Sequence, residues 1–301
     1  MRIVLNGQQA FGQAVLEALL DRGDNVVAVY CEPDTDPRRK DPLHQSAQDS
    51  GIEVIQPKSF KSERVLINFK SLQPDLAVMA YVTRIVPSSF LNAPTHGTIQ
   101  YHPSLLPAHR GPSSINWPII QGEKETGLTI FWPDEGLDTG PILMQKKVAI
   151  GPDDTLGSLY FDKLYPLGIE ALLGSIDLVK NGDAPRMVQD ESKASYESWC
   201  NDDSARVDWT QTTANIYNLI RGCNPQPGAW TNYPAGVVRF YDAKIAEMKG
   251  EPGSIVATSS EGIVVATVDG AIEIRRLREN DGPKIPAADS SLRVGTSFSL
   301  G

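Results

Sequence analysis

The sequence predicts an α/β protein with a doubly wound, mostly parallel sheet, followed by a smaller domain rich in β-strands. Its 301 residues exceed the ~100–200 residues typical of one domain. In the first half, short apolar runs alternate with amphipathic helical windows, a pattern typical of parallel βαβ units. In the last third, short apolar runs are separated by glycine and proline, which indicates short strands joined by tight turns.

The elements of the first half follow from two periodicities. Phe11, Val15, Leu16 and Leu19 recur at the spacing of one helix face and predict a helix directly after the first strand. The expected strands are at residues 2–5, 25–30, 51–55, 75–80 and 97–101. Strands that alternate with helices in this way predict a Rossmann-like sheet with helices on both faces.

The next segment extends the sheet and ends in a long helix. Residues 128–132 and 142–150 are expected to form a further pair of strands around a polar loop. Thr155 is placed to cap a helix rich in leucine and isoleucine, which Pro166 interrupts and Gly182 terminates.

Between about residues 182 and 204 the apolar periodicity gives way to mixed polar residues, which predicts a linker. Beyond it we expect a helix at residues 212–220 and a small OB-like barrel with strands at 237–241, 253–257, 263–267 and 271–276. The predicted organisation is therefore an α/β domain at residues 1–182, a linker at 183–203 and a β-rich domain at 204–301.

Composition is that of an ordinary globular protein, with 41% hydrophobic and 22% charged residues. No apolar run approaches the ~18 residues of a membrane span, and the first residues contain neither a charged leader nor an apolar core. The three cysteines are widely spaced without a CxxC pair, so disulfides and structural zinc are not expected. We therefore expect a cytoplasmic protein with no bound metal and no membrane partner.

The net charge of −9 comes from the first two thirds of the chain. From Ser204 onward the chain has ten basic and ten acidic residues, so this part has no net charge. Residues 1–203 therefore carry the whole excess of negative charge. A polyanion is repelled by nucleic acid unless it has a local basic patch. The candidate patches are small: residues 38–40, and the group Arg275, Arg276 and Arg278, which is typical of a solvated strand face.

Gly7 and Gly12 lie between the first strand and the first helix, where dinucleotide-binding folds carry phosphate-binding glycines. Glu32 follows where a ribose-binding acid would be expected. The spacing is G-x-x-x-x-G, however, and it lacks the remaining features of either phosphate-loop motif. We therefore interpret the two glycines as a tight β-to-α turn that requires close packing.

His102 stands at the end of the predicted strand that contains Gln100, and Pro103 and Pro107 stiffen the segment after it. Ligands of open α/β sheets bind beyond the carboxyl ends of the strands, so His102 is placed for function. Gln100 and His102 are two residues apart and share one face of an extended strand. A histidine at a strand end, taken alone, is more often structural.

Residues 134–140, DEGLDTG, form a loop of three acids and two glycines between two predicted strands. The loop is either a plain turn or a metal loop, and the EF-hand pattern of ligands is absent. A carboxylate on this loop would orient a neighbouring histidine and favour its charged form.

Two motifs together resemble a known family. HPSLLPAHRG at residues 102–111 and DEGLDTGPIL at residues 134–143 are similar to segments of the formyltransferases that use 10-formyltetrahydrofolate. The spacing of 36 residues between His102 and Asp138 also fits. The family includes methionyl-tRNA formyltransferase and the phosphoribosylglycinamide enzyme. The resemblance is greatest to the hydrolase domain of 10-formyltetrahydrofolate dehydrogenase, and it extends from GQQAFGQ to RGCNPQPGAW near residue 230.

The resemblance implies roles for single residues. His102 matches the catalytic histidine and Asp138 the aspartate that sustains it, whereas Gln100 occupies the position of the family's asparagine. The implied co-substrate is 10-formyltetrahydrofolate, released as tetrahydrofolate, and residues 1–182 become the formyltransferase domain. The folate pterin is expected against one backbone segment and one loop, which comprise Arg84, Ile85, Val86, Asp134, Glu135, Gly136 and Leu137.

The chemistry suits these groups. Attack on the carbon of the N10 formamide produces a tetrahedral oxyanion, to which a protonated His102 would donate. Asp138 would favour the imidazolium and, through water, pass a proton to the leaving nitrogen. Because Gln100 is one methylene longer than asparagine, its amide donor is expected to be displaced or turned away.

The expected function is therefore formyl transfer to an amine or to water by an enzyme. One alternative is methionyl-tRNA formyltransferase, but the loop EPDTDPRRKDPL has only three basic residues and the C-terminal domain is neutral. A second alternative is transfer to an amino sugar or another small amine, and a third is a non-catalytic module that binds folate or a nucleotide.

Overall fold

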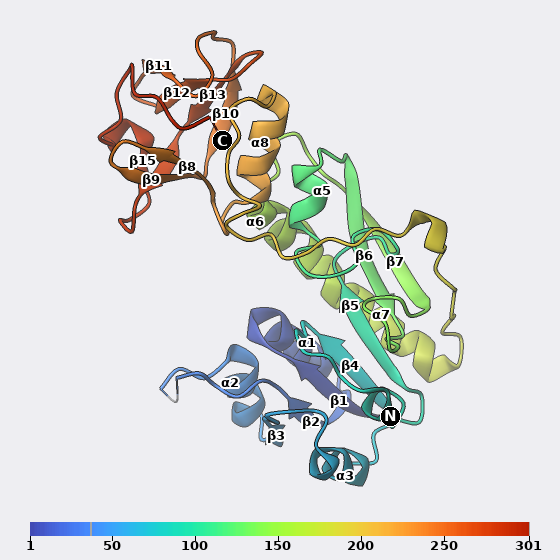
Figure 1. The fold of residues 1–301 in the computed structure, drawn as a ribbon. Helices are drawn as coiled ribbons and strands as arrows, with labels where there is room; N and C mark the ends of the chain where they lie inside the picture. Colours follow the sequence, from blue (N-terminus) through green and yellow to red (C-terminus); the bar gives the residue numbers. More distant parts are fainter. Residues whose placement is uncertain (37, 301) are drawn as a thin grey trace. The chain divides into compact units, whose positions relative to one another are not determined.

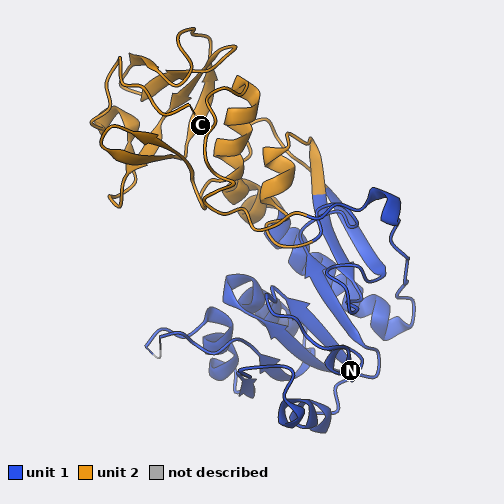
Figure 2. Ribbon diagram, in the orientation of Figure 1, with its two compact units in different colours: residues 1–110, 127–147, 164–196 blue, residues 111–126, 148–163, 197–301 orange. Residues whose placement is uncertain are grey.

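A computed structural model describes residues 1–36 and 38–300. The chain forms two compact units, which Figure 2 colours separately. Unit 1 comprises residues 1–110, 127–147 and 164–196, and unit 2 comprises residues 111–126, 148–163 and 197–301. Each unit draws on segments that are distant in sequence, and the division at residues 182 and 203 remains a prediction.

The larger sheet has seven strands in the order β3-β2-β1-β4-β5-β6-β7 (Figure 1). The pairs from β3 to β5 are parallel, and β6 runs antiparallel to β5. The predicted doubly wound, mostly parallel sheet is therefore confirmed. The strands are β1 (Arg2–Gly7), β2 (Asn25–Tyr30), β3 (Val54–Ile55), β4 (Leu76–Ala80), β5 (Thr98–His102), β6 (Glu125–Phe131) and β7 (Ile142–Ala149).

Two groups of helices pack on opposite faces of this sheet. On one face Tyr101 of β5 contacts Phe11 of α1, with ring centroids 4.5 Å apart. On the other face Met79 of β4 belongs to an apolar cluster with Phe69 of α3 and Phe90 of α4. The helices of the first two thirds are α1 (Gln9–Asp21), α2 (Pro42–Asp49), α3 (Glu63–Ser71), α4 (Ser88–Leu91), α5 (Asn116–Ile120), α6 (Leu156–Ser158) and α7 (Tyr165–Asn181).

Strands β1, β4 and β5 are in register near their carboxyl ends. Asn6 pairs with Met79 and Met79 pairs with Gln100, so these three side chains point to the same face of the sheet. Adjacent strands lie ~4.8 Å apart, which places the backbones of Asn6 and Gln100 roughly 10 Å apart. His102 lies two residues beyond Gln100, on the same face.

The helical segment expected after Thr155 is confirmed, with an irregular beginning. Thr155 caps α6 in a capping box with Ser158, and a π-helical turn at Leu159–Leu164 leads into α7. Pro166 lies in the first turn of α7, where a backbone N–H has no partner within the helix, so the missing N–H of proline costs nothing. Gly182 ends α7 in the left-handed conformation, with φ 77°.

Unit 2 carries two four-stranded antiparallel sheets, ordered β10-β13-β12-β11 and β15-β14-β9-β8. The rings of Trp209, Phe240 and Phe298 pack together in its core. The β-rich C-terminal region is thus confirmed. Its elements are α8 (Thr213–Gly222), β8 (Ala229–Tyr233), β9 (Gly236–Phe240), β10 (Ala243–Ala246), β11 (Ile255–Thr258), β12 (Ile263–Ala266), β13 (Ala271–Ile274), β14 (Arg276–Glu279) and β15 (Ile285–Pro286).

Strands β8, β10 and β15 were not expected from the sequence, and the strand expected at 271–276 covers β13 but only the first residue of β14. All three are short and only partly buried, so their pairing rests on backbone hydrogen bonds more than on an apolar pattern.

Candidate active site

His102 closes β5 with 6% of its surface exposed. Its Nε2 atom lies 2.9 Å from the carbonyl oxygen of His109. Because a carbonyl oxygen can only accept, Nε2 carries the hydrogen of this bond. The loop that brings this carbonyl to the ring is held by Ser104, whose hydroxyl donates to the Ala108 carbonyl at 2.7 Å.

Asp138 approaches the other nitrogen of the same ring from the loop between β6 and β7. Its Oδ2 lies 3.6 Å from Nδ1 of His102, within ion-pair range but beyond a good direct hydrogen bond. Asp138 is buried and adopts φ 56°, a left-handed conformation that few residues other than glycine enter. The structure therefore brings together the histidine and the aspartate that the two motifs singled out.

The ring of His102 thus has an acceptor beside each nitrogen. Nε2–H is committed to a backbone carbonyl, and Nδ1 faces a carboxylate. The two ring nitrogens therefore have different partners, a neutral carbonyl and a carboxyl group. Nδ1 is the nitrogen left to exchange a proton, with Asp138 beside it.

Gln100 lies half-buried on the same strand and sheet face as His102. Within residues 1–36 and 38–300, no protein group makes a hydrogen bond to its amide. The amide is therefore not committed to another group of the described chain, and its displacement from the oxyanion position stays a prediction.

The loop of Asp134 is organised by its own side chains. Asp134 Oδ1 accepts hydrogen bonds from the Gly136 N–H at 3.0 Å and the Thr139 hydroxyl at 2.6 Å. Glu135 Oε1 accepts from the hydroxyl of Ser88, at the first position of α4, at 2.9 Å. The predicted folate-binding loop is therefore bonded to the start of α4, two residues after Val86.

The segment Arg84, Ile85 and Val86 divides its side chains among three environments. Arg84 bonds to Glu32 and to the carbonyls of residues 57 and 58. Val86 is buried in the aromatic cluster, whereas Ile85 is 86% exposed. The side chain free to meet a ligand in this segment is therefore Ile85.

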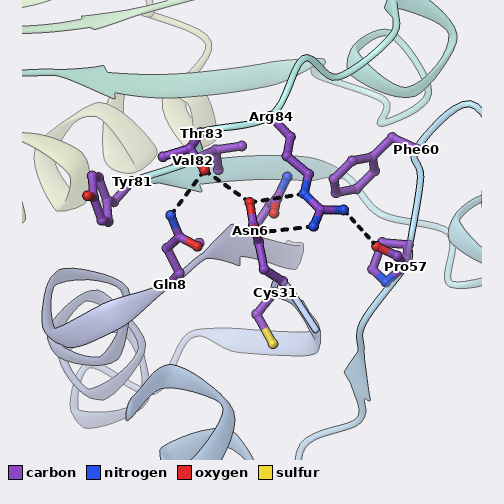
Figure 3. Close-up of a pocket in the computed structure, with 11 residues that line it drawn as sticks. Asn6, Gln8, Cys31, Pro57, Phe60, Tyr81, Val82, Thr83 and Arg84 are labelled. Atoms are coloured by element: carbon purple, nitrogen blue, oxygen red, sulfur yellow. Dashed lines mark hydrogen bonds and ion pairs between the residues drawn. The ribbon is translucent and has the colours of Figure 1, made fainter. Parts of the chain in front are cut away.

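A pocket opens at the carboxyl ends of β1 and β4, where the order of the sheet reverses (Figure 3). The Thr83 hydroxyl donates to Glu32 Oε1 at 3.0 Å and accepts from the Gln8 amide at 3.3 Å. The lining of the pocket includes Arg84 but none of the predicted catalytic residues. The lining residues are Asn6, Gly7, Gln8, Cys31, Glu32, Pro57, Phe60, Tyr81, Val82, Thr83 and Arg84.

The thiol of Cys31 in this pocket is not a nucleophile. Burial, together with the carboxylates of Asp41, Asp34 and Glu32, raises the pKa of Cys31 to about 12. The thiolate is the reactive form of cysteine, so Cys31 stays inert at neutral pH.

The two glycines after β1 are explained by close packing, as the sequence predicted. A Cβ on Gly7 would lie 2.3 Å from the Ala80 carbonyl oxygen, and one on Gly12 would lie 3.0 Å from a leucine side chain of α2. The first amide of α1, Gln9 N, donates to both carboxylate oxygens of Asp41 at 3.0 and 2.9 Å. The protein's own carboxylate thus fills the anion position of this helix, which argues against a dinucleotide phosphate there.

Sequence reasoning missed two buried polar residues near the histidine. Arg110 is completely buried, and its guanidinium donates to the side chain of Gln189 at 2.8 Å. Arg110 stands inside the quoted motif, but nothing in the spacing indicates burial. Gln189 stands in the predicted linker, whose lack of apolar periodicity hid its packing.

Across residues 1–36 and 38–300, no three His, Cys, Asp or Glu side chains gather as ligands for a metal ion. In the same part of the chain, no helix combines the length and the apolar character needed to cross a membrane.

The fold and the site define an α/β protein with polar residues gathered at the carboxyl end of a doubly wound sheet. The family described as "Formyl transferase" matches residues 1–172, and "Formyl transferase, C-terminal domain" matches residues 201–291. The chain belongs to the formyl transferase family. This confirms the resemblance carried by the two motifs.

Two curated relatives illustrate the range of the family. Methionyl-tRNA formyltransferase of Geotalea daltonii is 35% identical over 309 residues, which cover 100% of this chain and 98% of the relative. Mitochondrial 10-formyltetrahydrofolate dehydrogenase of Homo sapiens is 36% identical over 303 residues, which cover 96% of this chain. The chain spans 33% of the length of that dehydrogenase, about a third.

A solved structure shows the same fold. HypX from Aquifex aeolicus, in complex with tetrahydrofolic acid, superposes with a TM-score of 0.70 at 22% sequence identity. The match covers 96% of this chain and 46% of HypX.

Proposed function

We propose that this protein takes the formyl group from 10-formyltetrahydrofolate and passes it to an amine or to water. The observation that carries the proposal is the buried pair of His102 and Asp138, 3.6 Å apart, with the unengaged amide of Gln100 on the same strand face. Membership of the formyl transferase family supports formyl chemistry. The names of the relatives, among them a 10-formyltetrahydrofolate dehydrogenase, support a folate donor.

In this proposal the acceptor attacks the formamide carbon and a tetrahedral oxyanion forms. The Nδ1–H of the His102 imidazolium donates to that oxygen, and the Gln100 amide is a second donor. Fixed donors aimed at developing charge are usually the largest catalytic contribution. Asp138 faces Nδ1 and, through water, takes the proton that the attacking amine or water loses and passes it to N10, so that the C–N10 bond breaks as the carbonyl re-forms.

We place the folate donor on residues 84–86 and on the loop at residues 134–137, which the Ser88–Glu135 hydrogen bond ties to the start of α4. Ile85 and Leu137, one from each segment, expose 86% and 55% of their surfaces and offer apolar contact to a pterin ring. The pocket at the ends of β1 and β4 is left for the acceptor, since open α/β sheets bind ligands where the strand order reverses.

The proposal is tested by incubating the protein with 10-formyltetrahydrofolate and following the release of tetrahydrofolate, with and without candidate amines. The matched control is His102→Ala, which should abolish release while circular dichroism shows an unchanged fold. Normal turnover by the folded His102→Ala protein contradicts the proposal.

A second candidate is the formylation of methionyl-tRNA. The specific observation in its favour is the relative from Geotalea daltonii, which the chain matches over 98% of its length. The acceptor amine would then be the aminoacyl nitrogen, and the chemistry at His102 would be the same.

A further inference from the structure

Residues 187–196 form a strap along unit 1, in a region that the sequence predicted to be a linker. One end is fixed to β7, because Ile142 and Met187 exchange backbone hydrogen bonds of 2.8 and 2.9 Å. The other end is fixed to the loop after β5. There the Ser195 N–H donates to the Pro107 carbonyl at 3.1 Å, and the Arg110 N–H donates to the Ser195 carbonyl at 3.0 Å.

Gln189 lies in the middle of this strap with 5% of its surface exposed. Its Nε2 donates to the backbone carbonyls of Asp138 at 2.9 Å and of Gly140 at 2.7 Å. Both N–H hydrogens of the Gln189 amide are therefore donated to the loop whose Asp138 carboxylate faces His102. Since Asp138 has a positive φ of 56°, these two bonds hold a backbone conformation that the residue itself disfavours.

The oxygen of the same amide is bound to the histidine side of the site. Gln189 Oε1 accepts from Nε and Nη2 of Arg110 at 3.2 and 2.8 Å. Arg110 is fully buried and is also paired with Glu191 at 2.6 Å, which keeps the pKa of its guanidinium above the ordinary value. It directly follows His109, whose carbonyl holds Nε2 of His102.

We propose that Gln189 is a positioning residue that sets the distance between His102 and Asp138. This inference rests on the proposed function of His102 and Asp138. A buried guanidinium is costly unless its N–H groups are hydrogen-bonded, so the bonds from Arg110 hold the Gln189 side chain in place. Gln189 in turn fixes the Asp138 backbone relative to the His102 ring, through groups that touch neither substrate nor product.

The sharpest variant is Gln189→Glu. It keeps the shape and the acceptor oxygens for Arg110, but it has no N–H to donate to the carbonyls of Asp138 and Gly140. We expect kcat for formyl release to fall roughly 10²-fold, the loss that a displacement of ~1 Å can cause. Gln189→Met, which loses both halves of the contact, is the second variant and should be at least as slow.

Asn116→Leu is the matched control. The Asn116 side chain is also buried, and its Nδ2 donates to the backbone carbonyls of Gly222 at 2.9 Å and Gln226 at 3.5 Å, both within unit 2 and outside the loops of His102 and Asp138. The control should lower the unfolding temperature about as much as Gln189→Met. It should leave the ring ¹⁵N signals of His102 in the ligand-free protein unchanged, whereas both Gln189 variants should shift them.

A double-mutant cycle separates positioning from general damage. In the Asp138→Asn background, Gln189→Glu should change kcat by no more than about twofold, because the group it positions is already disabled. Multiplicative losses, or unshifted His102 signals in both Gln189 variants, overturn the inference while His102→Ala is still inactive. An active His102→Ala protein instead overturns the proposed function itself, so the two failures are distinguishable.

Discussion

The two nitrogens of His102 differ in what they contact, and that difference decides what each can do. The His109 carbonyl beside Nε2 orients the ring, but it cannot change charge. Asp138, 3.6 Å from Nδ1, is an ionisable partner that can exchange a proton with that side of the ring. Chemistry at this site is expected to pass through Nδ1.

Asp138→Asn should keep the shape of the loop and remove the carboxyl group that faces Nδ1 of His102. We expect formyl release to slow by roughly 10²–10⁴, the range typical of acid–base partners. The measurement is kcat/KM against pH for the variant and the original protein. A variant whose pH profile is unchanged would contradict the pairing of Asp138 with His102.

Gln100 is tested by a series of substitutions, because the resemblance of the motifs implies an asparagine at this position. Gln100→Asn should preserve or raise turnover with a good acceptor amine, since a shorter amide remains on the face of His102. Gln100→Leu should slow it by about 10²–10³, the loss seen for a single oxyanion donor.

The readout for this series is single-turnover loss of the formyl group from the bound donor. If Gln100→Asn is the slowest of the three proteins and Gln100→Leu lies between it and the original protein, Gln100 has a role of its own, such as positioning water. The inference from the family's asparagine would then fail at this position.

At the scale of the element, the loop between β6 and β7 has a shape that side chains would disrupt. A Cβ on Gly136 would lie 2.0 Å from the Thr139 hydroxyl, and one on Gly140 would lie 1.8 Å from the Trp132 carbonyl oxygen. Both distances are far inside van der Waals contact, so this loop needs glycine at two positions to deliver Asp138.

The segment before α6 depends on a charge. Burial alone would raise the pKa of Asp154, but hydrogen bonds from Lys163 and the Gly151 N–H, both 2.6 Å, lower it below 3.8. Because the pKa is lower in the folded state, the stabilisation is complete above the unfolded pKa. It is lost as the pH falls through the folded pKa.

Asp154→Asn should therefore lower the free energy of unfolding at neutral pH by about 2 kcal/mol, typical of a hydrogen bond to a charged group. It should also weaken the loss of stability below pH 3.8. Urea unfolding at pH 7 and under acid conditions measures both effects. The control is Asp190→Asn, whose Lys193 partner is largely exposed and whose loss should go undetected. Identical curves for Asp154→Asn and the original protein would refute the assignment.

At the scale of the whole molecule, the distribution of charge bears on the tRNA candidate. The protein carries −9, and two of the three clustered arginines of the C-terminal region lie near acids. Arg275 pairs with Glu273 at 2.8 Å, and Arg276 lies 3.9 Å from Asp242. Little unneutralised positive charge therefore remains to attract phosphates from a distance.

We accordingly predict weak binding of initiator tRNA. A mobility-shift titration at physiological salt should show no discrete complex, and affinity at low salt should depend only shallowly on salt. Tight binding that falls steeply with salt would instead favour methionyl-tRNA as the acceptor.

The contribution of each unit is tested with a chain that ends at Asp203. All residues proposed to hold the donor lie in unit 1, so binding of a stable folate analogue should persist. Segments 111–126 and 148–163 would lose partners within unit 2, such as the Gly222 carbonyl that binds Asn116 at 2.9 Å. The unfolding temperature should therefore fall. A soluble, folded fragment without folate affinity would show that unit 2 contributes to the donor site.

The order of elements in the large sheet was predictable because apolar periodicity records which side chains are buried. The strands at 25–30 and 75–80, the Thr155 cap and the Gly182 terminus all carried that local signal. Short strands such as β10, with little apolar character, did not.

The sequence by itself determined the family and its two motifs, and with them the candidates His102, Asp138 and Gln100. Only the tertiary structure showed that the apparent linker binds back to both motif loops through Gln189 and Arg110. Those contacts join residues 51 and 79 positions apart by hydrogen bonds between polar groups. Polar pairing over such distances leaves no periodic trace in a single sequence, because any polar residue at Gln189 fits the same local pattern.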